Sequence, residues 1–278
     1  MSYWRLLLRK PITIYEISNM KYPYWLFLIF FLFTSCERND PADPVDICSG
    51  FEDKVYNYSI YSCTEADSLD CSQKVLESVL LPDQYLKCSS TDSLTRTCLM
   101  YPFLGNIWLY NSIQQGFDHI MNMFNGFDEL FTRENANIEL IKVYQEINPE
   151  GVYDFSELAD QGAYMTQLTF IEITIAQFQL INKLTAEETE TLIEVCLDKY
   201  YDKSEIPSYS WLGEMSVLAI MARILYSQNY KPFMDELMSI SGLNNFIEWA
   251  SFMGLINIEE ITQFIISNAE NYLQELKK

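Results

Sequence analysis

Apolar residues recur at three- and four-residue spacings from about residue 72 to the end of the chain, the period of helices that bury one face. No two neighbouring segments alternate convincingly as a pair of strands would. The clearest helical stripe consists of Ile113, Phe117, Ile120, Met121 and Phe124. The pattern predicts an all-α fold of about eight helices, arranged as stacked helical hairpins or as a helical array.

Capping and turn residues indicate where individual helices begin and end. Thr185 followed by Glu188 predicts a capping box at the start of one helix, and Asn257 with Glu260 predicts a cap at the start of the last. Asn125-Gly126 predicts a left-handed turn that ends the helix over 113–124. We therefore expect the helices to be joined by short loops.

One segment, 156–183, permits two interpretations. It is apolar on more than one face, which is typical of a helix that runs through the middle of a domain. Within it, Ile171 to Ile175 alternates apolar and polar residues as a strand does. We expect a helix, and a strand over these five residues is the alternative.

The apolar run Tyr24–Phe33 is about ten residues long, whereas a membrane-spanning helix needs about 20. Lys21 precedes the run and small residues follow it, as in a secretory signal. Phe33-Thr34-Ser35-Cys36 resembles a bacterial lipobox, although Phe33 stands where leucine is usual. The resemblance implies that Cys36 becomes the first mature residue and carries fatty acids such as palmitate. The alternative is an ordinary secretory signal with an incidental cysteine.

The order of these features predicts four regions in the chain. Residues 1–35 are expected to be the signal peptide, and translation from Met20 instead of Met1 would give a more compact signal. Residues 36–50 read as a lipidated acidic tether, because prolines and acidic residues favour an extended, solvated chain. Residues 51–80 read as a cysteine-containing, loop-rich segment, and residues 81–278 as the α-helical domain.

Two further resemblances concern where the protein is located. The acidic residues after Cys36 look like the surface-export signals of Bacteroidota lipoproteins, although Arg38 and Asn39 interrupt them. Residues 81–102 and 111–133 resemble a segment of exported Bacteroidota proteins, and this resemblance carries no activity with it. Both imply a protein of the cell envelope that is lipid-anchored to the outer membrane, on its periplasmic or its surface face.

Six cysteines remain when Cys36 is set aside: Cys48, Cys63, Cys71, Cys88, Cys98 and Cys196. In an exported chain they predict at most two disulfides, both within residues 48–98. A bridge among the first three is favoured, because loop-like sequence there needs a crosslink. Cys196 falls in a helical pattern and is expected to be a free, buried thiol.

Catalytic and cofactor motifs are absent from the sequence, so we expect no cofactor, no metal site and no catalytic residue that can be named. The formal net charge of −21 argues against nucleic-acid binding, because an acidic chain repels phosphates. His119, the only histidine, is expected at the edge of a helix's polar face. A hydrolase that acts on envelope glycans or peptides through two carboxylates is the alternative function, since the chain has many acidic residues.

Tyrosine and tryptophan are abundant for an acidic helical chain, with 19 Tyr and 5 Trp. Candidates to line a peptide or glycan groove are Tyr101, Trp108, Tyr110, Tyr209 and Trp211. More often such residues lie in the core with the polar atom at the surface. Ser68 and Ser93 match a short O-glycosylation pattern of Bacteroidota, and Ser68 is the better candidate because Ser93 is expected on a helix. These features together predict a lipid-anchored, non-enzymatic module that binds or assembles with an envelope protein or a glycan.

Overall fold

The computed structural model describes residues 48–63, 70–209, 211–251, 254–255 and 257–278. It is 70% helical, and no strand occurs among these residues, so the all-α class is confirmed. The predicted signal peptide, Cys36 and most of the acidic tether lie outside the described residues. Residues 46–278 form one compact unit, and the fold below is that of this unit.

The described residues contain thirteen α-helices and two 3-10 helices, where the sequence pattern predicted about eight helices. The elements are α1 (Cys71–Ser78), α2 (Asp83–Cys88), α3 (Thr91–Leu99), η2 (Leu104–Leu109), α4 (Ile113–Met123), α5 (Asn125–Thr132), α6 (Ala136–Glu146), η3 (Pro149–Asp154), α7 (Leu158–Ile175), α8 (Phe178–Ile181), α9 (Ala186–Ser204), α10 (Trp211–Ser227), α11 (Lys231–Glu236), α12 (Leu243–Trp249) and α13 (Ile258–Leu276). The predicted number was wrong because several helices are only four to eight residues long. A period of 3.6 residues is not recognisable over so short a window.

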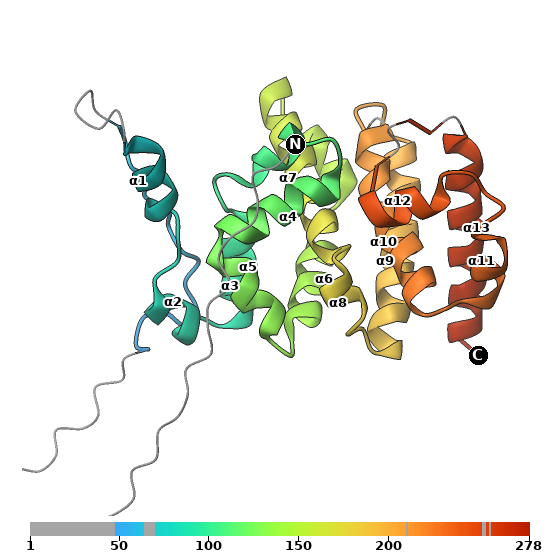
Figure 1. Ribbon diagram of the computed structural model, residues 1–278, viewed down its shortest axis with the longest axis horizontal. Coiled ribbons are helices and arrows are strands. Elements are labelled where there is room, and N and C mark those ends of the chain that lie inside the picture. The colour runs from blue at the N-terminus through green and yellow to red at the C-terminus, as the bar shows by residue number, and fades with distance from the viewer. Residues whose placement is uncertain (1–47, 64–69, 210, 252–253, 256) are drawn as a thin grey trace, which may run out of the picture. The chain divides into compact units, whose positions relative to one another are not determined.

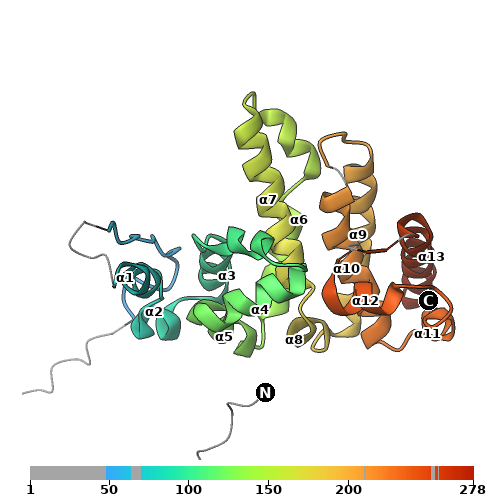
Figure 2. The same cartoon turned by 45° about the horizontal axis from the view of Figure 1, so that its top comes forward.

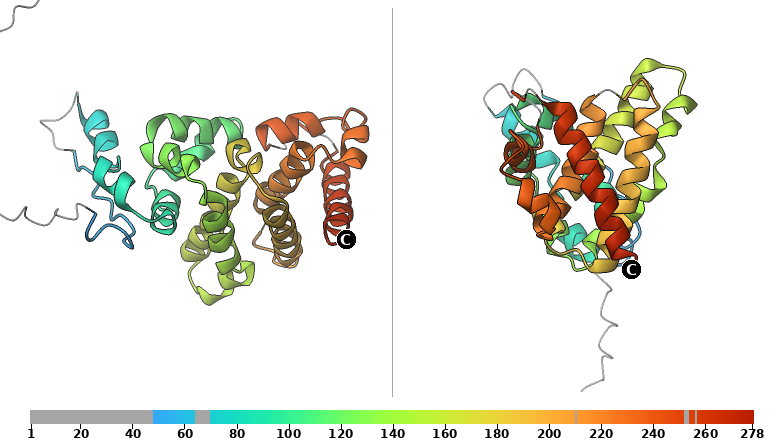
Figure 3. Two further views of the ribbon diagram at one scale, coloured as in Figure 1. Left: turned by 90° about the horizontal axis from the view of Figure 1, so that it is seen from below. Right: turned by 90° about the vertical axis from the view of Figure 1, so that its right-hand side faces the viewer.

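Helix α10 is the central element of the C-terminal half. It packs against α7 and α9 on one side and against α12 and α13 on the other, and Figure 1 shows α9, α10 and α13 beside one another. Its buried apolar side chains are Met215, Val217, Leu218, Ala219, Ile220, Met221, Ala222, Ile224 and Leu225. A helix with apolar residues on every face is stable only when neighbours cover all of it, which α10 achieves. The last helix, α13, runs along α9 and α10 (Figure 3).

Helix α7 confirms the helical interpretation of segment 156–183 as far as Ile175, and a separate short helix, α8, covers part of the remainder. The strand alternative over Ile171 to Ile175 is wrong. All five of these residues are buried, because α3, α6 and α10 pack around this half of the helix. Because this half of the helix is buried on every face, it lacks the polar face that marks an amphipathic helix in a sequence. The apolar and polar residues can therefore alternate as they do in a strand. Glu172 and Thr174 are therefore buried polar groups that need internal hydrogen-bond partners.

The capping predictions had mixed outcomes. Thr185 and Glu188 form the predicted capping box of α9. Asn125-Gly126 does not end α4 as a left-handed turn; it begins α5, because the Asn125 amide accepts from Leu81 N at 2.9 Å and donates to Leu81 O at 2.8 Å. Asn257 precedes α13 without accepting a capping bond, and its amide donates instead to the Glu260 carboxylate.

Two disulfides form, Cys48–Cys88 and Cys63–Cys71, both within the predicted range. Cys98 and Cys196 are free and buried, as predicted for Cys196. Burial raises the pKa of both thiols, so they stay protonated and unreactive.

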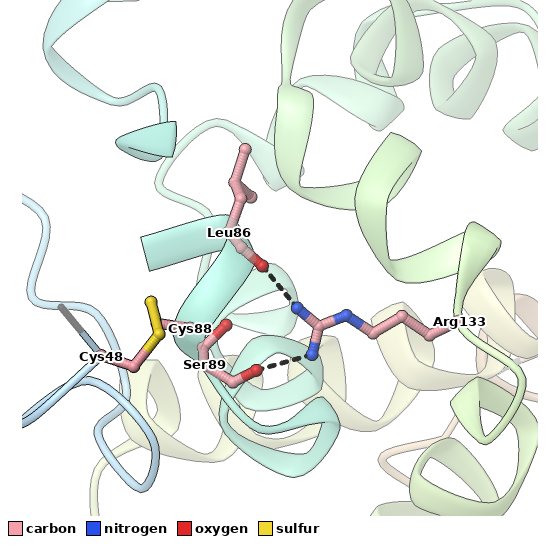
Figure 4. The surroundings of a disulfide bond; sticks show 5 residues. All are labelled: Cys48, Leu86, Cys88, Ser89 and Arg133. Atoms are coloured by element: carbon pink, nitrogen blue, oxygen red, sulfur yellow. Dashed lines mark hydrogen bonds between the residues drawn. A yellow bond between two sulfur atoms is a disulfide. The ribbon is translucent and has the colours of Figure 1, made fainter. Parts of the chain in front are cut away.

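The loop-rich segment after Cys48 is held against the helices, and its described residues, 48–63, form no α-helix. The Tyr85 hydroxyl donates to Lys54 O at 2.8 Å, and Tyr56 N donates to the Thr97 hydroxyl at 2.9 Å. Arg133 donates to the carbonyls at the end of α2, next to the Cys48–Cys88 bridge (Figure 4). The chain is therefore fixed to the body from the first disulfide onwards.

Four cationic side chains close the carboxyl ends of helices. Besides Arg133 at α2, Lys183 donates to Phe131 O in the last turn of α5 at 2.6 Å, and Lys199 donates to the carbonyl that follows α6. Arg223, which is 1% exposed, donates to Ala176 O at the end of α7 and to Ile247 O and Glu248 O at the end of α12. The last carbonyls of a helix lack partners and carry partial negative charge, so a cation stabilises them. Since these basic groups are used internally, the acidic groups dominate the surface.

Candidate functional site

The structure separates the five aromatic candidates. Trp108 and Tyr209 line one pocket, which we call the aromatic pocket. Tyr101 is 3% exposed and stacks on Phe124 in the core, with ring centroids 4.0 Å apart. Tyr110 packs against the ring of His119 at 4.9 Å. The side chain of Trp211 lies outside the described residues.

The aromatic pocket has a volume of about 270 Å³. Its lining residues are Trp108, Gly162, Met165, Thr166, Thr169, Ser208, Tyr209 and Gly213. Gly162, Thr166 and Thr169 recur at helical spacing and so lie on one face of α7. None of the described lining residues is charged. The result is a hollow between two aromatic rings, with small side chains and one methionine along its helical wall.

Trp108 is held in position by the packing of η2 against α4. A Cβ atom at Gly116 of α4 would lie 2.3 Å from Ile107 O, so only glycine allows the two elements to approach this closely. The Trp108 ring stacks on Phe170 of α7 with centroids 6.4 Å apart. Trp108 is nevertheless 42% exposed, which leaves ring surface available to a ligand.

A buried polar cluster lies directly behind Tyr209 and Gly213. Lys203 pairs with Glu172 at 2.7 Å, and both side chains are 0% exposed. Lys203 also donates to Gly213 O at 2.7 Å and lies over the Tyr209 ring at 5.5 Å. The Tyr144 and Ser216 hydroxyls donate to the same carboxylate. This cluster joins α6, α7, α9 and α10 and fixes one wall of the aromatic pocket.

Exposed apolar side chains occur on the elements that line the pocket and on η3, which packs against α7. The first half of α7 is poorly covered, and Figure 2 shows it rising above α3 and α4. Leu158 at its start is 82% exposed, Tyr153 of η3 is 62% exposed and Leu109 of η2 is 77% exposed. Exposed apolar groups of this kind are typical of a protein-binding surface.

The remaining sequence candidates do not join this site. Cys36 and Ser68 lie outside the described residues. Ser93 is on α3 and 3% exposed, so it is not an accessible glycosylation site. His119 is half-buried on α4. No metal-binding cluster occurs within the described ranges, and no helix there is long and apolar enough to cross a membrane.

Carboxylates meet in a different pocket, of about 490 Å³, between α6 and the start of α9. Its lining includes Glu187 and Glu188, and the Glu188 carboxylate accepts a hydrogen bond from Thr185 N at 2.7 Å. Glu188 is thus engaged in capping α9. Its neighbour Glu187 is exposed. We see no arrangement here that favours a two-carboxylate hydrolase.

The sequence identified the two aromatic members of the pocket but missed its helical wall. Gly162, Thr166 and Thr169 form a small-residue repeat inside an apolar helix, and that repeat is the signal from which the wall could have been predicted. Comparison with protein-family models, with curated proteins and with solved structures found no match to the chain.

Proposed function

We propose that this chain is a lipid-anchored cell-envelope protein that binds a partner protein through the aromatic pocket. The observation that carries the proposal is the convergence of Trp108, Tyr209 and Met165 around an uncharged hollow. Tryptophan, tyrosine and methionine are enriched at protein interfaces, because they bury a large apolar area. Nothing in this arrangement requires catalysis, so the proposed protein is a binding module and not an enzyme.

The occupant we propose is a large apolar side chain of the partner, flanked by basic residues. The hollow accepts an apolar group, and the strongly acidic chain, with a formal net charge of −21, attracts positive charge. A glycan is less suited to this pocket, because the hydroxyls of Thr169 and Tyr209 already donate to the carbonyls of Met165 and Pro149. Pairwise packing of α6 with α7, α9 with α10, and α10 with α13 supports the further proposal of a helical array, which offers extended docking surfaces.

The anchor sets how far the body can lie from the membrane. Eleven residues lie between Cys36 and Cys48, where the first disulfide fixes the chain to the body. Even fully extended, such a tether spans at most about 40 Å. Several acyl chains on one cysteine give stable attachment, whereas a single chain does not. The module would therefore act on partners at or near the outer membrane.

Replacing Cys36 with alanine is expected to abolish fatty-acid labelling of the protein, because its thiol is the proposed acylation site. Cells grown with an alkynyl fatty acid would be lysed and the two proteins compared after conjugation to a fluorophore. The variant should also move from the membrane fraction to the soluble fraction. Equal labelling of both proteins would refute the anchor.

Replacing Trp108 with alanine is expected to lower the yield of a crosslinked partner in intact cells by about tenfold or more, the effect of a central interface aromatic. The measurement is crosslinking followed by affinity purification of the anchored protein. Trp249→Ala is the matched control, because Trp249 lines another pocket and the same residue type is removed. An absent partner, with turnover of an envelope glycan or peptide that depends on one acidic residue, would favour the hydrolase instead.

A further inference from the structure

We propose that a second pocket, between the start of α4 and the end of α12, binds a neutral saccharide. We call it the amide pocket. Its lining residues are Asn111, Ser112, Gln115, Asn245, Trp249 and Ser251, and its volume is about 260 Å³. The site is separate from the aromatic pocket and shares no lining residue with it. Saccharide binding at the amide pocket can therefore be tested independently of the proposed protein partner.

The polar groups of the amide pocket match the chemistry of sugar hydroxyls. A hydroxyl group both donates and accepts hydrogen bonds, and a side-chain amide offers a donor and an acceptor in one plane. The amides of Asn111, Gln115 and Asn245 bond to no other described residue, so they are available to a ligand. None of the lining residues that the structure describes is charged, which favours a neutral sugar over a uronate or a phosphate.

Trp249 supplies the apolar contact that a sugar ring requires. It is half-buried at the end of α12, so part of its indole ring faces the pocket or solvent. The face of an aromatic ring carries negative charge density and attracts the C–H groups on one side of a pyranose. An aromatic platform with convergent polar groups is the general form of a small-ligand site.

The fold holds both walls of the amide pocket in fixed positions. On the α4 side, the Ser112 hydroxyl caps the helix by accepting from Gln115 N at 3.1 Å. On the α12 side, the buried guanidinium of Arg223 donates to Ile247 O at 2.8 Å and to Glu248 O at 2.9 Å, just before Trp249. Rigid placement lowers the entropy that binding must overcome.

The backbone at the end of α12 has an unusual conformation. Ala250 has φ 46°, in the left-handed region that residues other than glycine seldom adopt. Its N–H closes α12 by donating to Phe246 O at 2.8 Å. This turn determines the direction in which Trp249 and Ser251 leave the helix. Backbone strain of this kind is concentrated at functional sites, which agrees with a binding role.

The test is a titration of the full-length protein, in a detergent without sugar head groups, with maltotriose, cellotriose and N,N′,N″-triacetylchitotriose. Binding would be followed by calorimetry. We expect saturable binding of at least one of these neutral sugars. Trp249→Ala and Asn245→Ala should each weaken it by about tenfold, because they remove the platform and a paired donor and acceptor.

Trp108→Ala is the matched control and should leave sugar affinity unchanged, just as Trp249→Ala should leave the protein partner bound. Circular dichroism of each variant would show that it remains folded. Failure of all three sugars to bind would overturn the proposal, and so would equal affinity of the wild type and Trp249→Ala. Loss of binding in Trp108→Ala alone would assign the sugar to the aromatic pocket and equally overturn it.

Discussion

Replacing Lys203 with methionine is expected to lower the free energy of unfolding by about 3–5 kcal/mol. The substitution leaves the Glu172 carboxylate fully buried without its cation, and the two remaining hydroxyl donors cannot neutralise its charge. It also removes the donor to Gly213 O, so the wall of the aromatic pocket should loosen. Urea unfolding of the full-length variant, followed by circular dichroism, measures the loss.

Lys231→Met provides the control for this prediction. Lys231 also pairs with an acid, Asp235, but its side chain is 81% exposed. Exposed pairs of this kind contribute at most about 1 kcal/mol, so the control should unfold almost as the wild type does. Replacing Glu172 with leucine in the Lys203→Met background should recover part of the loss, because it removes the unpaired charge. If Lys203→Met were as mild as the control, the buried cluster would not hold the four helices as described.

Removing the Cys48–Cys88 disulfide is expected to lower the free energy of unfolding by about 4 kcal/mol. The expected value follows from the chain entropy that a crosslink removes from the unfolded state, with a sequence separation of 40 between the two cysteines. The pair Cys48→Ala and Cys88→Ala would be compared with the wild type by urea unfolding under oxidising conditions. Because this bridge fixes the tethered segment to α2, the variant should also become sensitive to proteolysis before residue 63.

The second disulfide is the internal control. Cys63 and Cys71 are separated by 8 residues, so the same relation gives a smaller loss of about 2.5 kcal/mol when both are replaced. The order of the two losses is the prediction that matters most. A larger effect from Cys63 and Cys71 would show that loop closure does not govern the stability of this region.

The sequence predicted the fold class because long amphipathic stripes survive in α4 and α13 and a capping box marks α9. The prediction from sequence failed where a side chain forms a hydrogen bond with a distant part of the chain. Asn125 has the sequence context of a helix end, yet its amide pairs with the Leu81 backbone 44 residues away. Such tertiary hydrogen bonds leave no local pattern, so propensity alone gives the wrong turn.

The aromatic pocket, the buried cluster and the amide pocket differ in how much of each could be predicted from the sequence. Trp108 and Tyr209 were candidates because large aromatics are conspicuous in an acidic chain. Glu172 was not a candidate, because a single acidic residue in an alternating stretch has the pattern of an exposed strand position. The structure shows instead that Glu172 is buried within a helix. The amide pocket combines residues around 111–115 with others around 245–251, and uncharged surface amides have no periodic signal. Only the packing of α4 against α12 brings them together.

The central claim is that a partner protein docks in the aromatic pocket, and a photo-crosslinking amino acid in place of Thr166 tests it most directly. Thr166 lines the pocket, whereas Lys231 lies on α11 outside it and is the control position. In intact cells the account predicts one discrete adduct with an envelope protein from position 166. That adduct should disappear in the Trp108→Ala background, and position 231 should give none. No adduct at position 166, or the same adduct from both positions, would contradict the account.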